Sequence, residues 1–400
     1  MEPKKIVELM ILTGTLFTLN GCYMRAASCE QDDTAQQAHP SSAQMKNVEA
    51  ELIQDAIAPP KPSERLLKGN IQLHDPAGIV EDKEYLYTFA TGNGFRMTYL
   101  PPGGDEWLAG NRIWPRREMP AWIEELLPGN KGVWAPHAPF PRVIYYSCAD
   151  DSDGKDKAVI GRLTAKGEPP DFTWIDDGKP VLVCDRDDLT EPFAIDPAVF
   201  PGDQGSLWLV YGSHWSGIWV VELDPETGHI KNDRARKEGW KEDNPAFHFV
   251  ASELGKYNNK PVPEPGFIAG QIEAPYVFQL FQGMYYLFVN WGICCQGVDS
   301  TYEIRVGRSV NPHGPYLDKD GKDMREGGGT LFLATEGRFI GPGHANIWMY
   351  PDSKGTIRYI FTYHFYDGED EGKAKMHARE LEWDDDKWPV LTDTVFRKRE

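Results

Sequence analysis

The sequence predicts an all-β fold, and more specifically a five-bladed β-propeller. From about residue 69 onward, strand-forming runs bounded by Gly, Pro, Asp and Asn dominate, and few helical periods are present. One unit recurs five times: a short motif that sets polar or charged residues beside Pro or Gly, a polar turn, and a strongly aromatic strand. The motifs are HDP at 74–76, WAPH at 134–137, AIDP at 194–197, IEAPY at 272–276 and GHAN at 343–346.

The spacing of these units is what favours a propeller. The motifs start roughly 60–80 residues apart, which is enough for one four-stranded sheet each. Sheets arranged radially leave few exposed edges, and the first strand of each sheet lines the central channel. The motifs would then meet at one end of the axis, and with them Asp75, Asp196 and Glu273. A sandwich of two sheets with long loops is the competing interpretation.

The fourth unit shows the strand pattern most clearly. Residues 272–281 are predicted to form a first strand, 282–283 a tight turn, 284–291 a nearly all-apolar second strand and 302–308 a third. The first strand carries one carboxylate, Glu273. A buried carboxylate is costly unless it faces a cavity or a partner, so Glu273 is a candidate functional group. A salt-bridged or surface glutamate is the alternative.

The amino-terminal segment predicts export. Lys4 and Lys5 precede a short apolar run at 9–19, the pattern of a secretory signal peptide, and the run is too short to span a membrane. The sequence LNGC at 19–22 resembles a bacterial lipoprotein box, which implies a lipid on Cys22; an ordinary signal peptide cleaved nearby is the alternative. The chain is thus expected to comprise a signal peptide, a flexible tether and a propeller domain, at 1–21, 22–65 and 66–400.

Composition narrows the class of partner. The formal net charge of −19 argues against nucleic acid, which requires a basic face. Membrane contact is expected only through the lipid anchor, in the bacterial envelope, facing the periplasm or the cell surface. Besides Cys22, five cysteines remain, an odd number without CxxC spacing, so a full disulfide framework is not expected. Cys294 and Cys295 are predicted to be buried free thiols, with a vicinal disulfide as the alternative.

Two sections interrupt the strand pattern. Residues 99–133 are rich in Pro and Gly but contain three tryptophans, which favours an ordered functional section with a short helix at 119–127. Residues 233–265 are highly charged and are predicted to be an insertion that faces solvent.

The three carboxylates suit the hydrolysis of a glycosidic bond. That reaction needs a carboxylic acid that protonates the leaving oxygen and a carboxylate that activates water on the other face of the sugar. A third carboxylate nearby raises the pKa of the acid by like-charge repulsion. Two Asp and one Glu among aromatic rings, which offer flat apolar surfaces to sugars, therefore fit the roles of base, modulator and acid.

Longer blocks carry a resemblance to a known family. They are GSHWSGIWVVELDPETG at 212–228, CCQGVDSTYEIRVGRS at 294–309, GPY and DKDGK within 314–322, and GGGT at 327–330. With the short motifs, in this order, they make the chain resemble glycoside hydrolase family 43, a family of five-bladed propeller enzymes, and most of all its arabinanases. The resemblance implies that Asp75 is the general base, Asp196 the residue that tunes and orients the acid, and Glu273 the acid. It implies inversion, with acid and base roughly 6.5–9.5 Å apart.

The same resemblance assigns further positions. His344 corresponds to a histidine that in arabinanases helps hold a metal ion, usually Ca²⁺, through a mostly water shell; a packed core histidine is the alternative. No organic cofactor is implied. Positions along the sugar cleft correspond to His74, Trp134, Ser213 and Trp215. Of these, His74 is expected to orient Asp75 rather than perform chemistry, and the tryptophans have core packing as their alternative.

The expected activity is that of an inverting endo-α-1,5-L-arabinanase acting on plant cell-wall arabinan and arabino-oligosaccharides. An exo-acting α-L-arabinofuranosidase or β-xylosidase of the same family is the first alternative, because residues 99–133 could either leave a groove open or close it. A non-catalytic glycan-binding lipoprotein that keeps the propeller is the second. One departure bears on substrate preference: family members commonly show WAPD where this chain has WAPH, with His137 at the acidic position.

Overall fold

The computed structural model describes residues 65–396 apart from gaps at 93–94, 115–117, 131, 151–155, 187–190, 215, 254–269 and 281–282. The predicted signal peptide, the lipidation site Cys22 and the tether up to residue 64 lie outside the described residues. Among the described residues, no helix combines the length and the apolar character needed to cross a membrane.

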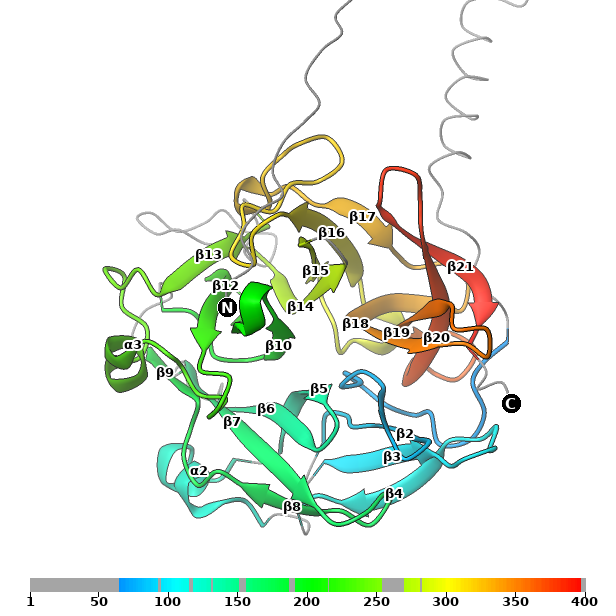
Figure 1. Cartoon of the computed structure of the whole chain (residues 1–400), viewed down its shortest axis with the longest axis horizontal. Helices are drawn as coiled ribbons and strands as arrows, with labels where there is room; N and C mark the ends of the chain where they lie inside the picture. The colour runs from blue at the N-terminus through cyan, green and yellow to red at the C-terminus, as the bar shows by residue number, and fades with distance from the viewer. Residues whose placement is uncertain are drawn as a thin grey trace, which may run out of the picture. The chain divides into compact units, whose positions relative to one another are not determined.

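The strands of the described residues form five antiparallel sheets, or blades, that follow one another along the chain and surround a common centre (Figure 1). Blade 1 contains β1 (Val80–Asp82), β2 (Tyr85–Thr88), β3 (Arg96–Leu100) and β4 (Leu108–Arg112). Blade 2 contains β5 (Trp134–Phe140), β6 (Val143–Asp150), β7 (Asp156–Lys166) and β8 (Thr173–Asp176), with β9 (Leu182–Arg186) also paired to β7.

The remaining three blades repeat the same up-and-down order. Blade 3 contains β10 (Ala198–Pro201), β11 (Leu207–Ser213), β12 (Gly217–Leu223) and β13 (Phe247–Ala251). Blade 4 contains β14 (Ile272–Leu280), β15 (Met284–Trp291), β16 (Glu303–Ser309) and β17 (Thr330–Leu333). Blade 5 contains β18 (Phe339–Pro351), β19 (Ile357–Asp367), β20 (Lys373–Trp383) and β21 (Pro389–Val395).

The first strand of each blade faces the hub. Successive first strands contact one another, from β1 to β5, β10, β14 and β18, and Figure 1 shows β5, β10, β14 and β18 closest to the centre. Blade 5 closes onto blade 1, where Asn346 Nδ2 donates to the carbonyl of Pro76 at 3.1 Å. The predicted five-bladed propeller is therefore confirmed, and the two-sheet sandwich is wrong.

Apolar side chains fill the spaces between neighbouring blades. One cluster joins blades 1 and 2, a second blades 2 and 3, a third blades 3 to 5, and a fourth blades 5 and 1. Fully buried aromatic residues such as Tyr87, Tyr211 and Phe361 dominate them. Each fully buried ring stabilises the fold by roughly 1.5–3 kcal/mol. This packing accounts for the many aromatic residues that the sequence places on these strands.

The two irregular sections are ordered where they are described. Helix α2 (Ala121–Leu126) lies within the predicted 119–127 helix, and Nε1 of its Trp122 donates to Asp176 Oδ1 at 2.7 Å. In the second section, the expectation of a solvent-facing insertion is partly wrong. It contains helix α3 (Asp233–Glu238) and β13, the outer strand of blade 3, because Phe247 and Val250 bury apolar side chains there.

The cysteines differ from the prediction of free thiols at 294–295. Cys294 and Cys295 form a vicinal disulfide, and Cys295 is exposed. The chain has left β15 at this point and lies at the surface, so no apolar core shields the sulfurs. Cys148 and Cys184, which lie on strands of blade 2, are the buried free thiols among the described residues.

Candidate active site

A shared backbone conformation marks the hub end of every blade. One residue of each motif has a positive φ although it is not glycine: Asp75 (50°), Ala135 (39°), Asp196 (51°), Ala274 (50°) and His344 (61°). In β5, β14 and β18 the pairing register shifts at this point, as in a β-bulge. Such residues cost on the order of 1–3 kcal/mol each, and bulges re-aim side chains. The five motifs therefore share a local geometry that presents side chains at the hub.

Hydrogen bonds to neighbouring blades hold four of these strained residues. Each backbone N–H donates to a side chain: Asp75 to His364 Nδ1 at 3.2 Å, Ala135 to Thr91 Oγ1 at 2.9 Å, Ala274 to Asp196 Oδ2 at 2.9 Å, and His344 to Asn290 Oδ1 at 3.0 Å. A buried N–H without a partner would be costly, so these bonds offset part of the strain. They also fix the blades relative to one another around the hub.

The two oxygens of Asp75 have different surroundings. Oδ2 accepts a hydrogen bond from Thr91 Oγ1 at 2.5 Å and lies 2.8 Å from His74 Nδ1. Oδ1 has longer contacts, at 3.4 Å to His364 Nδ1 and 3.7 Å to His344 Nδ1. Oδ1 is therefore the oxygen that is better placed to accept a proton from a water molecule at the hub.

His74 keeps Asp75 ionised. Burial alone would raise the pKa of Asp75, but the charge and hydrogen bond of His74 hold it well below its usual range. Burial lowers the pKa of His74, yet the charge and hydrogen bond of Asp75 outweigh burial and raise it. His74 and Asp75 therefore form an imidazolium–carboxylate pair, in which each partner favours the charged form of the other.

His364 contacts Asp75 as a neutral hydrogen-bond acceptor and not as a cation. Nδ1 of His364 accepts the backbone N–H of Asp75, so the hydrogen-bond network assigns the ring proton to Nε2. Burial lowers the pKa of His364 well below its ordinary value. Burial also lowers the pKa of His344. Both rings are neutral, and neither forms a true ion pair with Asp75 despite the short distances.

His74 is held from its far side as well. Its ring stacks on that of His364 with the centroids 4.3 Å apart, and its Nε2 lies 2.7 Å from the hydroxyl of Tyr366. The backbone N–H of Cys295 donates to the same hydroxyl at 2.7 Å. The loop that carries the vicinal disulfide thus connects through Tyr366 and His74 to Asp75.

Asp196, which lies beside Glu273, has electrostatic surroundings opposite to those of Asp75. Both are buried, with 8% and 5% exposure. Burial and the negative charges of Glu273 and Asp75 raise the pKa of Asp196 well above its ordinary value, against the smaller effect of the Ala274 N–H. The hub thus holds one carboxyl group whose surroundings favour the ionised form, Asp75, and one whose surroundings favour the protonated form, Asp196.

One histidine contacts Glu273 directly. His214 lies in the turn between β11 and β12, and its Nε2 is 2.7 Å from Glu273 Oε2. The His214 side chain is 35% exposed, whereas that of Glu273 is 7% exposed. His214 therefore connects a buried carboxyl group to the solvent side of the hub.

The structure brings the three predicted carboxylates and His344 together, with His74 beside Asp75. Trp134 is half-buried and packs against the cluster between blades 2 and 3. Ser213 ends β11, and its side chain is outside the described residues, as is Trp215. His137 is buried, and its Nδ1 accepts the backbone N–H of Val199 at 3.0 Å. Because burial lowers the pKa of His137 to about 3, it is a neutral link between blades 2 and 3.

Four residues around the carboxylates were not singled out from the sequence: Thr91, His214, His364 and Tyr366. A signal existed for three of them. His364 and Tyr366 alternate on β19 and so lie on one face of a strand. His214 stands out as an imidazole within the apolar and small residues of GSHWSG. Thr91 carries no pattern of its own, and its role depends on a contact between blades 1 and 2.

His74, Asp75 and His364 form a group of metal-ligating residue types, and their ligand atoms lie within 4.8 Å of one another. These atoms are already committed, because His74 Nδ1 bonds to Asp75 and His364 Nδ1 accepts the Asp75 N–H. The set therefore fits a metal poorly. His344 is a better candidate, since its neutral imidazole is a suitable ligand and its Nδ1 faces Asp75 at 3.7 Å.

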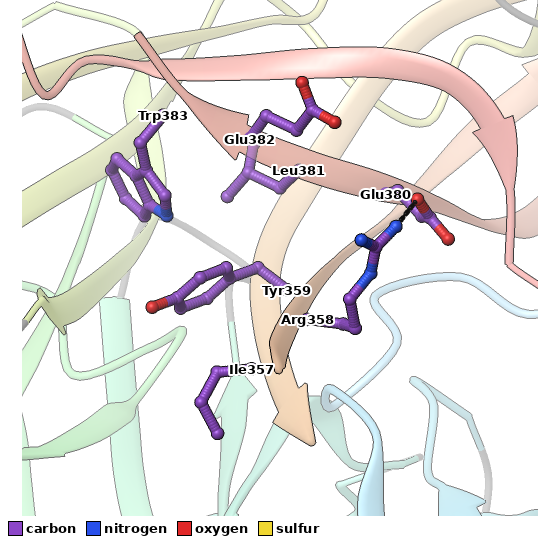
Figure 2. A pocket seen from close by; sticks show the side chains of 7 residues that line it. All are labelled: Ile357, Arg358, Tyr359, Glu380, Leu381, Glu382 and Trp383. Atoms are coloured by element: carbon purple, nitrogen blue, oxygen red, sulfur yellow. Dashed lines mark hydrogen bonds and ion pairs between the residues drawn. The ribbon is translucent and has the colours of Figure 1, made fainter. Parts of the chain in front are cut away.

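A pocket of about 300 Å³ lies away from the hub motifs, on β19 and β20 of blade 5, as Figure 2 shows. Its charged wall is the ion pair of Arg358 and Glu380. Trp383, at its other side, stacks on Phe278 with centroids 5.9 Å apart and also contacts Tyr286. The ring is thus engaged in packing between blades 4 and 5, and the pocket contains none of the predicted site residues.

Comparison with known proteins agrees with this geometry. The sequence matches the family model described as glycosyl hydrolases family 43 over residues 70–389. It is 31% identical over 328 residues to an extracellular exo-α-(1→5)-L-arabinofuranosidase of Cellvibrio japonicus, covering 81% of this chain and 87% of the relative. It is also 31% identical over 328 residues to an extracellular endo-α-(1→5)-L-arabinanase of Bacillus subtilis, covering 80% and 88%.

Solved structures show the same similarity. The chain aligns with an α-L-arabinanase of Cellvibrio cellulosa, determined in complex with arabinohexaose, with a TM-score of 0.65 and 28% sequence identity. The alignment covers 82% of this chain and 96% of that structure. The similarity therefore extends over the propeller as a whole and not over single motifs.

Proposed function

The chain belongs to glycosyl hydrolases family 43, and from this premise we propose that it hydrolyses α-1,5-L-arabinofuranosidic bonds within arabinan chains, with inversion. The observation that carries the proposal is the opposite surroundings of two aspartates at equivalent positions. Asp75 is held as a carboxylate by His74, whereas the pKa of Asp196, which lies beside Glu273, is raised by burial and by the charges of Glu273 and Asp75. Cleavage of a glycosidic bond needs this combination, a base and an acid available at the same pH.

In the proposed mechanism Asp75 is the base. His74 and Thr91 hold Oδ2, so Oδ1 takes the proton of the water that attacks the anomeric carbon. Glu273, on the other side of the bond, passes its proton to the leaving oxygen, and the configuration inverts. Asp196 lies beside the acid and tunes it. Its bond to the Ala274 N–H also fixes the backbone next to Glu273.

The preferred substrate follows from the relatives. One is named an endo-acting and another an exo-acting enzyme for α-1,5-linked arabinose, and the compared structure holds arabinohexaose. Arabinan is neutral, so a net charge of −19 does not repel it. Arabinan and arabino-oligosaccharides are thus the proposed partners.

Digestion of debranched arabinan, sugar-beet arabinan and xylan tests the proposal. We expect a ladder of arabino-oligosaccharides from debranched arabinan at the first time points, and a newly formed reducing end of inverted configuration by NMR. Arabinose as the first and sole product would support exo action, and preferential release of xylose from xylo-oligosaccharides a β-xylosidase. Binding of arabinan without turnover would support a glycan-binding protein and contradict the hydrolase.

For a metal, we propose Ca²⁺ held by His344 and otherwise by water. A hard cation with a water-rich shell suits a hub that carries several carboxylates and a neutral imidazole. When bound, it would supply positive charge that favours the ionised form of Asp75. Metal analysis of the purified protein and its thermal unfolding with and without EDTA, compared between wild type and His344→Ala, test this assignment. Equal metal content in both proteins would contradict it.

For location, we propose export and attachment to the bacterial envelope through a lipid on Cys22. The support is the sequence pattern at 4–22 and the extracellular relatives. Wild type is expected in the membrane fraction and Cys22→Ser in the soluble fraction of the producing cells. Equal distribution of the two would favour an ordinary cleaved signal peptide.

A further inference from the structure

We propose that His214 positions Glu273 and returns a proton to it after each turnover. This role rests on the hydrolase function proposed above. It is carried by a short contact, 2.7 Å between His214 Nε2 and Glu273 Oε2, that joins an exposed ring to a buried carboxyl group.

The need for such a residue follows from the reaction. Each turnover leaves Asp75 with a proton gained from water and Glu273 without the proton that it gave to the leaving oxygen. The enzyme must therefore reload Glu273 before the next cleavage. Since the Glu273 side chain is only 7% exposed and a bound sugar chain would cover the hub further, direct contact with solvent is restricted. The His214 side chain is 35% exposed, its Nε2 contacts the acid and its Nδ1 is buried, so a proton from solvent would enter at Nε2.

The proton balance of the reload is simple. Protonated His214 passes the hydrogen on Nε2 to the Glu273 carboxylate at Oε2, which yields neutral imidazole and a carboxylic acid. The imidazole then takes a proton from water or buffer at Nε2, since Nδ1 is buried, and Asp75 releases the proton that it gained to solvent. Rotation about the terminal bond of Glu273, a broad torsion in glutamate, presents the new acid proton to the leaving oxygen. No oxidant, metal or further reactant is involved.

The other charged groups facing Glu273 cannot replace His214. Asp196, from blade 3, is itself buried, so a proton that it gave away would have to be replaced from solvent by another group. Asp75 and His344, from blades 1 and 5, belong to the base side of the hub, where the ionised carboxylate must be kept. His214 is thus the group whose geometry links the acid to solvent.

The test compares two replacements of His214 on two substrates. In His214→Ala, kcat for an arabino-oligosaccharide should fall on the order of 10–100-fold, with KM within about threefold, because proton return and not binding is lost. An aryl arabino-oligosaccharide with a 4-nitrophenolate leaving group needs no acid, so its kcat should fall much less. Added imidazole should restore the slow reaction of His214→Ala in proportion to its concentration.

His214→Gln separates proton return from positioning. Glutamine keeps a hydrogen-bond donor for Glu273 but cannot relay a proton, so this variant should stay slow on the oligosaccharide and retain KM. Full activity of His214→Gln, the absence of rescue by imidazole, or an equal loss on both substrates would overturn the relay. The matched control is His229→Gln, which removes another histidine–carboxylate contact, 3.0 Å to Asp177, away from the hub motifs. It should show neither the substrate difference nor the rescue.

These outcomes are distinguishable from failure of the proposed function. If wild type does not cleave arabinan, the hydrolase assignment fails. If wild type is active and the His214 variants behave like the His229 control, the hydrolase assignment stands and the role of His214 is wrong.

Discussion

Asp75 in blade 1 and Asp196 in blade 3 occupy the same place in their blades and are nevertheless in opposite states. Their φ values are 50° and 51°, each precedes a proline, and each points into the hub. Yet the pKa of Asp75 is lowered and that of Asp196 is raised. The repeated backbone delivers the two carboxyl groups in the same way, and the neighbouring blades decide what each group can do.

The difference lies in what surrounds each carboxylate. Asp75 meets imidazoles from its own blade and from blade 5, together with the hydroxyl of Thr91. Asp196 meets a second carboxylate, Glu273, from blade 4 and one backbone N–H. A shift of one pKa unit corresponds to about 1.4 kcal/mol, so a few such contacts are enough to separate a base from an acid.

The largest effect on the rate should come from removing either the base or the acid. Asp75→Asn and Glu273→Gln keep the shape of the side chains but cannot act as base or acid, so kcat on arabinan should fall by on the order of 10²–10⁴-fold each. Initial rates measured beside circular dichroism spectra check this. A folded variant with a near-wild-type rate would remove that residue from the mechanism.

A smaller loss is expected from Asp196→Asn, which removes the charge but leaves an oxygen that can accept the Ala274 N–H. Without this neighbouring carboxyl group, the alkaline limb of the kcat profile should move to lower pH. The profile between pH 5 and 9 measures the shift. An unchanged alkaline limb would mean that Asp196 does not tune the acid.

His74→Gln should shift the acidic limb of the pH profile, which reports the pKa of the base. His74 lowers the pKa of Asp75, so its loss should raise that pKa. Asp75 would then be protonated at higher pH, and the acidic limb of kcat/KM should move upward, with a modest loss at neutral pH. The pH profile of kcat/KM between pH 4 and 8 measures this shift. A shift of the alkaline limb instead would place His74 on the acid side of the reaction.

The smallest effect on rate is expected at Asp367, a buried carboxylate outside the hub constellation. Its oxygens lie 2.6 Å from Arg338 and 2.7 Å from Lys375, and its pKa falls from 3.8 to about 2 against the opposing effect of burial. Because the folded-state pKa is lower, this group stabilises the fold by about 2 kcal/mol above pH 4. That contribution disappears as the pH falls through about 2.

Asp367→Asn should therefore lower the Tm at pH 7, where the stabilisation is present, and leave kcat unchanged at 25 °C. The difference in Tm from wild type should shrink as the pH is lowered towards 2. An altered kcat would show that the ion-pair cluster of blade 5 is coupled to the hub, and an unaltered Tm would show that the cluster contributes nothing to stability.

Several features could be predicted from local sequence patterns. The five motifs, the aromatic strands and the turns between them predict five sheets, because strand formation and turn chemistry depend on neighbouring residues. The radial closure of those sheets predicts that Asp75, Asp196 and Glu273 approach one another. Strand β15 (Met284–Trp291) has the predicted bounds, since its apolar run is flanked by Gly283 and Gly292, which both have a positive φ.

Other features depend on contacts between residues that are distant in the chain. Four contacts join two blades: His364 with Asp75, His74 with Tyr366, His137 with Val199 and His214 with Glu273. A pKa follows from the burial and charges around a group, and these exist only after the blades have packed. The sequence by itself thus determined which groups reach the hub, whereas the tertiary structure decided which of them is charged, which is neutral and which is connected to solvent.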